Sequence, residues 1–133
     1  MTGSTASIGA TKYVFALDCP DASALAAFYA RLLGWRASDT SPDAEWVDVR
    51  PPEGESAAFW IACQRVEDHR APEWPDGPIP QQAHLDFYVA SIADSTPHAL
   101  AAGARKHEYQ PSPDGHFVVF LDPAGHPFCL CEE

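Results

Sequence analysis

The sequence predicts an α+β protein in which one strand–helix–three-strand unit occurs twice. Each copy has an apolar segment, then a helical segment that ends at a glycine, then a strand-like segment that meets a second glycine-containing turn. Gly34 and Gly54 mark these places in the first copy, and Gly103 and Gly125 mark them about 70 positions later. Such regular spacing indicates one supersecondary unit used twice, so function is expected where the two units meet.

The two units are expected at about residues 12–66 and 83–132, within a single domain that spans residues 1–133. A chain of 133 residues that is 46% hydrophobic is long enough to bury a core. Between the units, residues 67–81 contain four prolines and predict an extended linker without helix or strand.

The helix of the first unit is predicted to begin after Asp21, a good N-cap, and to end at Gly34, which adopts left-handed backbone readily. Apolar residues with helical spacing lie between these ends, at Leu25, Phe28, Tyr29 and Leu32. Three strands are expected to follow, at about residues 35–38, 45–50 and 58–66.

The second unit repeats this order with a weaker helical segment in residues 92–102. Pro97 lies inside the segment and has no backbone N–H to donate. We therefore expect this helix either to start late, near Pro97, or to hold the proline in its first turn.

Charge and composition exclude several classes of partner. Eight basic against nineteen acidic residues give a net charge of −11, which repels a phosphate backbone, so no nucleic acid partner is expected. No apolar run of about 18 residues occurs, so no membrane span is expected. Residues 1–11 lack the features of a signal peptide, and Cys19, Cys63, Cys129 and Cys131 show no CxxC spacing. These features favour a cytoplasmic protein with reduced thiols.

Five motifs, taken in order, carry a family resemblance. They are Leu17-Asp18-Cys19-Pro20-Asp21, residues 28–35, Gln64-Arg65-Val66, His84-Leu85-Asp86 and residues 122–130. Together they resemble the vicinal oxygen chelate superfamily, which contains glyoxalase I, the extradiol dioxygenases and the bleomycin-resistance-type binding proteins. The resemblance is greatest to its glyoxalase-like domain branch and covers about residues 12–132.

The resemblance implies a cupped, eight-stranded open barrel of two βαβββ repeats, with the helices outside and a small-molecule pocket inside. It also implies a homodimer, with the pocket either within one chain or between two chains. Alternation along the strands then assigns the cavity-facing residues. They are Val14, Ala16 and Asp18 on the first strand, Trp60, Ala62 and Gln64 on the fourth, His84, Asp86 and Tyr88 on the fifth, and Cys129 and Cys131 on the last.

A one-residue bulge would reverse the assignment of the fourth strand. Trp46 on the third strand and Trp60 on the fourth are expected either to line the cavity or to fill the core. As a cavity wall, the two indole rings would suit planar or cationic ligands.

Metal-dependent members of the superfamily resemble one another in placing His, Gln or Glu on the first, fourth, fifth and eighth strands. The first of these positions is Val14 here, which cannot bind a metal, so no metal cofactor is expected. If a divalent metal is bound, its expected ligands are His84, Cys129 and Gln64, with Asp86 as a further weak candidate.

His84 and Asp86 share a strand face, and we expect their side chains to be too far apart for an ideal hydrogen bond but able to converge on one ligand. His84 is the candidate catalytic residue, as a general base near neutral pH. The alternative is that both residues are hydrogen-bonded members of the barrel with a structural role.

Two functions from different classes follow. The first is a binding protein with a metal-free pocket that sequesters a cationic or aromatic small molecule. Its expected ligand-binding residues are His84, Asp86, Gln64, Trp60, Asp18, Cys129 and Trp46. The second is a metal-dependent lyase, isomerase or dioxygenase of the glyoxalase and extradiol dioxygenase type.

Overall fold

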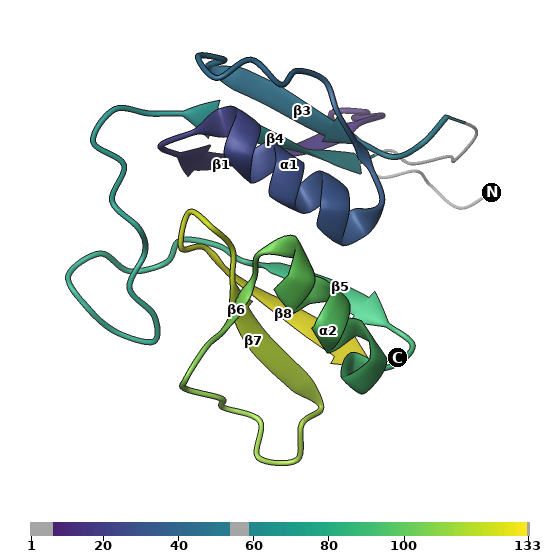
Figure 1. Cartoon of the computed structure of the whole chain (residues 1–133), viewed down its shortest axis with the longest axis vertical. Coiled ribbons are helices and arrows are strands. Elements are labelled where there is room, and N and C mark those ends of the chain that lie inside the picture. The colour runs from purple at the N-terminus through teal and green to yellow at the C-terminus, as the bar shows by residue number, and fades with distance from the viewer. Residues whose placement is uncertain (1–6, 54–58, 133) are drawn as a thin grey trace.

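A computed structural model of the chain describes residues 7–53 and 59–132 (Figure 1). Its elements are β1 (Tyr13–Cys19), α1 (Ala22–Leu33), β2 (Arg36–Ala37), β3 (Trp46–Arg50), β4 (Phe59–Arg65), β5 (Leu85–Val89), α2 (Ile92–Ala102), β6 (Arg105–Lys106), β7 (Phe117–Leu121) and β8 (Pro127–Glu132). The order βαβββ occurs twice, which confirms the predicted repeat. Gly54 and the predicted start of the fourth strand at residue 58 lie outside the described residues.

The eight strands form two open sheets of four strands each, in the orders β1-β4-β3-β2 and β5-β8-β7-β6. In each sheet the first strand of the unit pairs in parallel with the last, and the remaining pairs are antiparallel. β1 and β5 are therefore edge strands. Two βαβββ units with unclosed sheets agree with the predicted α+β class and its cupped open barrel.

Both predicted ends of α1 are confirmed. The Asp21 carboxylate accepts a hydrogen bond from the backbone N–H of Ala24 at 3.0 Å, and Gly34 takes the left-handed conformation at φ 71°. The buried side of α1 consists of Ala22, Leu25, Ala26, Phe28 and Tyr29. This side packs on β3 and β4, whose Val47, Val49, Ile61 and Cys63 are fully buried.

The prediction for the second helix is wrong, because α2 begins before Pro97 and holds it in its interior. The Ser91 hydroxyl accepts a hydrogen bond from the N–H of Asp94 at 3.1 Å and starts the helix there. Pro97 removes only its own N–H donor, and the Thr96 hydroxyl donates to the Ile92 carbonyl at 2.7 Å within the same turn. The helix therefore begins at the Ser91 cap and continues through Pro97.

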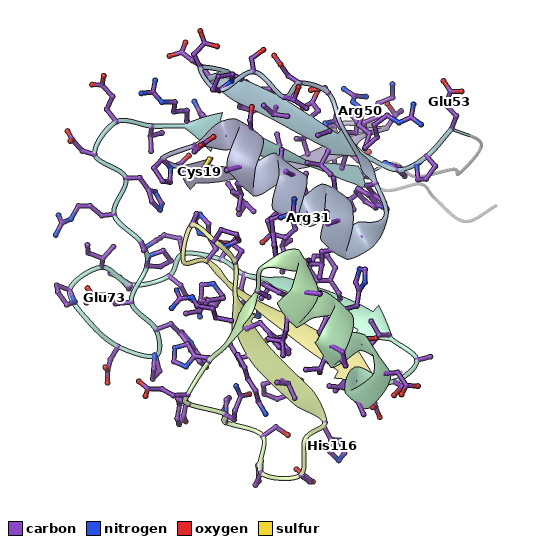
Figure 2. The ribbon with its side chains drawn as sticks, viewed as in Figure 1. Cys19, Arg31, Arg50, Glu53, Glu73 and His116 are labelled. Atoms are coloured by element: carbon purple, nitrogen blue, oxygen red, sulfur yellow. The ribbon has the colours of Figure 1, made fainter. Side chains whose placement is uncertain are left out.

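Helix α1 also packs against the second unit, as Figure 1 shows. The Phe28 and Tyr29 rings lie 6.0 and 6.4 Å from the Phe128 ring on β8. The buried Tyr29 hydroxyl donates to the buried Asp122 carboxylate at 2.6 Å. Arg31 is directed from α1 toward the second unit (Figure 2), where its guanidinium donates to the Ala102 carbonyl at 2.9 Å. The apolar sides of both sheets thus meet at α1.

Among the described residues, no helix covers the opposite sides of the two sheets. We call them the first helix-free face, on the sheet of β1 to β4, and the second helix-free face, on the sheet of β5 to β8. The strand register places Asp18, Trp46, Asp48, Trp60 and Gln64 on the first face, and Asp86, Tyr88, Cys129 and Cys131 on the second. Apart from Trp46 and Asp48, strand alternation had predicted that these side chains share the helix-free side of their sheet. Because α1 lies against the apolar side of both sheets, the two helix-free faces of one chain point away from each other.

The segment between the units has no helix or strand in residues 66–84, as predicted for the linker. It is nevertheless held against the second unit. His69 Nε2 lies 3.0 Å from the Ala124 carbonyl oxygen, and Gly125 lies so close to Ala71 that a Cβ at Gly125 would stand 2.6 Å from the Ala71 Cβ. Over the described residues, neither helix is long and apolar enough to cross a membrane.

Candidate functional site

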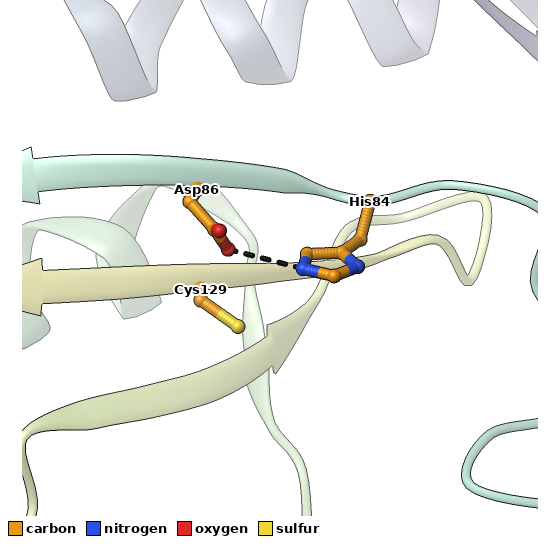
Figure 3. Close-up of side chains that lie close together, drawn as sticks. All are labelled: His84, Asp86 and Cys129. Atoms are coloured by element: carbon orange, nitrogen blue, oxygen red, sulfur yellow. Dashed lines mark ion pairs between the residues drawn. The ribbon is translucent and has the colours of Figure 1, made fainter.

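The second helix-free face brings together His84, Asp86 and Cys129 (Figure 3). Asp86 on β5 is the register partner of Cys129 on β8, so both side chains project from the same side of the sheet. His84 Nε2 lies 3.2 Å from Asp86 Oδ1. The two side chains therefore lie at ion-pair distance and converge, as expected. His84 precedes the first residue of β5, so strand geometry does not fix its direction, and its ring extends along the strand to the carboxylate.

The three side chains differ in exposure. The side chains of His84 and Asp86 are 42% and 43% exposed, whereas Cys129 is buried. Burial, with the nearby charge of Asp86, raises the pKa of the Cys129 thiol to about 12. At neutral pH the thiol is protonated, so it is neither a nucleophile nor a thiolate ligand unless a cation compensates the charge.

The same three residues are the candidate metal ligands of the described chain, because their donor atoms all lie within 4.8 Å of one another. One imidazole, one carboxylate and one thiol fit a borderline ion such as zinc better than magnesium or manganese, which prefer oxygen ligands. Gln64, which the sequence placed with His84 and Cys129, lies on the first helix-free face instead. Within one chain, the third candidate ligand is therefore Asp86 and not Gln64. The Val14 side chain has no atom that could bind a metal.

The first helix-free face carries an ordered cluster around Asp48. The Trp46 and Trp60 indoles both donate to Asp48 Oδ1, at 2.9 and 3.3 Å, and Arg50 donates to Asp48 Oδ2 at 3.0 Å. The Arg50 guanidinium also lies 4.0 Å from the centre of the Trp60 ring. We call Trp46, Asp48, Arg50 and Trp60 the indole platform.

Asp48 holds this platform together as a carboxylate. Partial burial acts to raise its pKa, but the hydrogen bonds from Arg50, Trp46 and Trp60 outweigh burial and leave the pKa below its usual value. Asp48 and Arg50 were not among the residues expected at the site. Strand alternation in residues 46–50 could have indicated both residues, because it puts Trp46, Asp48 and Arg50 on one face of β3.

The remaining predicted binding residues lie on the first helix-free face, where Gln64 is the register partner of Trp46. Asp18 and Gln64 are register partners on the first helix-free face. Asp18 also lines a cavity of about 440 Å³ that is bordered by the linker, beside His69 and His126. Trp46 is 48% exposed, so it does not fill the core. The predicted site residues thus divide between the two faces.

A smaller cavity, of about 220 Å³, opens beside the His84 cluster. Its wall combines His84, which precedes β5, with Cys129 of β8, Phe117 of β7, and Trp74 and Gln81 of the linker. No sequence pattern indicated Gln81, because its position depends on how the linker folds back.

Two βαβββ units with these open sheets define a member of the vicinal oxygen chelate superfamily. More narrowly, the chain belongs to the glyoxalase-like domain family, whose sequence model matches residues 14–131. No curated protein is a significant relative in sequence.

Solved structures of low sequence identity share the fold. The fosfomycin resistance protein FosX from Listeria monocytogenes matches with a TM-score of 0.64 and 17% identity, over 94% of this chain and 92% of that one. Lactoylglutathione lyase from Agrobacterium tumefaciens matches with a TM-score of 0.59 and 23% identity, over 95% and 96%. The antibiotic binding protein TnmS3 from Streptomyces sp. CB03234 matches with a TM-score of 0.57 and 18% identity, over 90% and 92%.

Proposed function

We propose that the chain is a small-molecule-binding protein that acts as a homodimer, with each pocket between the first helix-free face of one copy and the second helix-free face of the other. The observation that carries the proposal is the direction of the two faces. Each bears an ordered group of functional side chains, yet α1 separates them within one chain. A second copy supplies the missing half of each pocket.

The edge strands support this assembly. Tyr13, Val14 and Phe15 on β1 are 52%, 44% and 49% exposed, and Tyr88 on β5 is 67% exposed. Both strands lie at open edges of their sheets, where backbone groups remain free to pair with another chain. Apolar exposure concentrated on such edges is typical of an interface.

The side chains favour a planar ligand that carries positive charge. The indole platform offers the Trp46 ring and the Trp60 ring, the latter with Arg50 over one face, and the second copy would bring Asp86, a carboxylate that is 43% exposed. Asp48 contributes less to cation binding, because Arg50 already compensates its charge at 3.0 Å. The net charge of −11 attracts cations to the protein as a whole. TnmS3, which has this fold, is an antibiotic binding protein and gives a precedent for binding.

The pocket is proposed to work without a metal. Val14 leaves the first-strand position without a donor. The proposal also treats residues 1–133 as one domain, since α1 packs on the first sheet and contacts Phe128 of the second. It places the protein in the cytoplasm, where its four free cysteines stay reduced.

The second candidate function is a metal-dependent lyase, isomerase or dioxygenase. The observation in its favour is the convergence of His84, Asp86 and Cys129 donor atoms within 4.8 Å. A metal held there would supply a Lewis acid for a substrate oxygen. His84 would then be a ligand, which leaves its ring unable to act as the general base through the same nitrogen.

The decisive experiment combines assembly, metal content and binding. We expect a dimer by light scattering, sub-stoichiometric metal by elemental analysis in both the wild type and His84→Ala, and one planar cationic aromatic ligand per chain by calorimetry. Trp60→Ala should weaken binding, whereas His116→Ala, a remote and exposed control, should not. A monomer that binds with full affinity would refute the shared pocket. Stoichiometric metal that is lost in His84→Ala would establish the second candidate.

A further inference from the structure

We propose that the linker sets the specificity of this pocket, with Trp74 stacking on a flat aromatic ligand while Gln81 accepts a hydrogen bond from an N–H or O–H group of that ligand. The inference rests on the proposed function, because the cavity beside His84 is the part of the pocket that one chain builds alone. It goes further by naming the ligand class as a fused aromatic ring that carries a hydrogen-bond donor.

The size and walls of the cavity support a small flat occupant. Its volume is about 220 Å³. Pockets for drug-sized ligands usually measure about 300–1,000 Å³, so this one holds a single bicyclic ring. Trp74 and Phe117 line it with aromatic surface.

Trp74 is fixed although it lies in a segment without regular structure. Its ring packs on His107 at 5.1 Å and on Tyr109 at 5.5 Å between centroids. The Gln110 side chain links His107 to β7. Its amide N–H groups donate to the carbonyls of His107 and Val119 at 2.7 and 2.9 Å, and its amide oxygen accepts from the Val119 N–H at 2.8 Å. A ligand therefore meets a preorganised aromatic surface.

The loop that presents Trp74 is closed on itself. The Ile79 N–H donates to the Glu73 carboxylate at 3.1 Å, and the Glu73 N–H donates to the Ile79 carbonyl. Gly77 adopts φ +146°, and a Cβ there would stand 2.6 Å from the Glu73 Cβ. Only glycine allows this close approach, so the loop holds Trp74 in one place.

Gln81 supplies the polar group of the cavity wall. Among the described residues, its Oε1 is the buried side-chain oxygen or nitrogen atom that lacks a hydrogen-bond partner. Buried acceptors are nearly always paired, and an unpaired one is costly. Gln81 also lines the cavity, so a molecule bound there lies beside its terminal amide. A ligand with a donor at its edge restores the missing bond.

Indole and 1-benzothiophene test the inference, because they have nearly the same shape and only indole has an N–H. Both are titrated into the intact protein by calorimetry. We expect wild type to bind indole ~10-fold more tightly, as one hydrogen bond to a buried acceptor allows. In Gln81→Leu the ratio should fall to about 1, whereas Gln82→Leu, a change of the same kind at the next residue, should keep it. Trp74→Ala should weaken both probes equally.

Equal affinities in wild type, or a preference for indole that survives in Gln81→Leu, would overturn the inference and leave the proposed function intact. Gln81→Met replaces Gln81→Leu if that variant does not fold. Absence of binding by both probes also overturns the inference. The proposed function would be refuted as well in either of two cases. In the first, the planar cationic ligands do not bind; in the second, they bind the Trp60→Ala variant as tightly as the wild type.

Discussion

Replacing Tyr29 by phenylalanine tests the contact that joins α1 to the second unit. The substitution removes only the hydroxyl that donates to Asp122 at 2.6 Å, where both residues are buried. Asp122 Oδ1 keeps the N–H groups of Ala124 and His126, at 2.9 and 3.0 Å, but Oδ2 loses its Tyr29 donor. A hydrogen bond to a charged group contributes about 1.5–3 kcal/mol, and a buried unpaired oxygen adds to the loss. We expect unfolding free energy to fall by about 3 kcal/mol.

Urea denaturation at one fixed chain concentration measures the change, since assembly would otherwise shift the apparent stability. Tyr13→Phe is the matched control, because its hydroxyl contacts the Ala10 carbonyl at 3.3 Å in an exposed position. We expect the control to change stability by less than about 0.5 kcal/mol. A loss for Tyr29→Phe no larger than that of the control would refute the reasoning, and with it the role of α1 in fixing the two units.

Three further predictions follow from single contacts. Burial raises the pKa of the Cys19 thiol to about 11 from 9.0, so its contribution to stability is full below pH 9 and is lost as pH rises toward 11. Urea midpoints from pH 8 to 11 should fall less steeply for Cys19→Ala, and parallel curves would contradict this. Asp48→Ala should release Trp46 and Trp60 and weaken planar ligands by about tenfold in calorimetry, and unchanged affinity would remove the platform from the site. Gly125→Ala should lower unfolding free energy by about 2 kcal/mol in urea titrations, because φ is +92° and the added Cβ meets Ala71, and an unchanged midpoint would show that the linker yields freely.

Local features of this protein could be predicted from its sequence because neighbouring residues decide them. Asp21 and Gly34 set the ends of α1 through hydrogen bonds and backbone preferences that act within a few residues. Strand alternation placed Asp18, Trp60 and Gln64 on one face for the same reason. The start of α2 was predicted wrongly, because Pro97 suggested a late start whereas the helix begins at the Ser91 cap.

The grouping of the candidate site needed the tertiary structure. His84 contacts Asp86 because it stands just outside β5, and Asp48 gathers two indoles that lie on different strands. Gln81 reaches the cavity only because the linker folds back along the second unit.

The sequence by itself determined the two βαβββ units, the limits of α1 and the face of most strand residues, since hydrogen bonding and side-chain alternation act over short distances along the chain. Only the tertiary structure decided how the units sit together. That arrangement depends on Phe28 and Tyr29 packing against Phe128, a contact between residues about 100 positions apart, and sequence periodicity carries no information about such pairs. Because this packing puts α1 against both sheets, it turns the two helix-free faces apart.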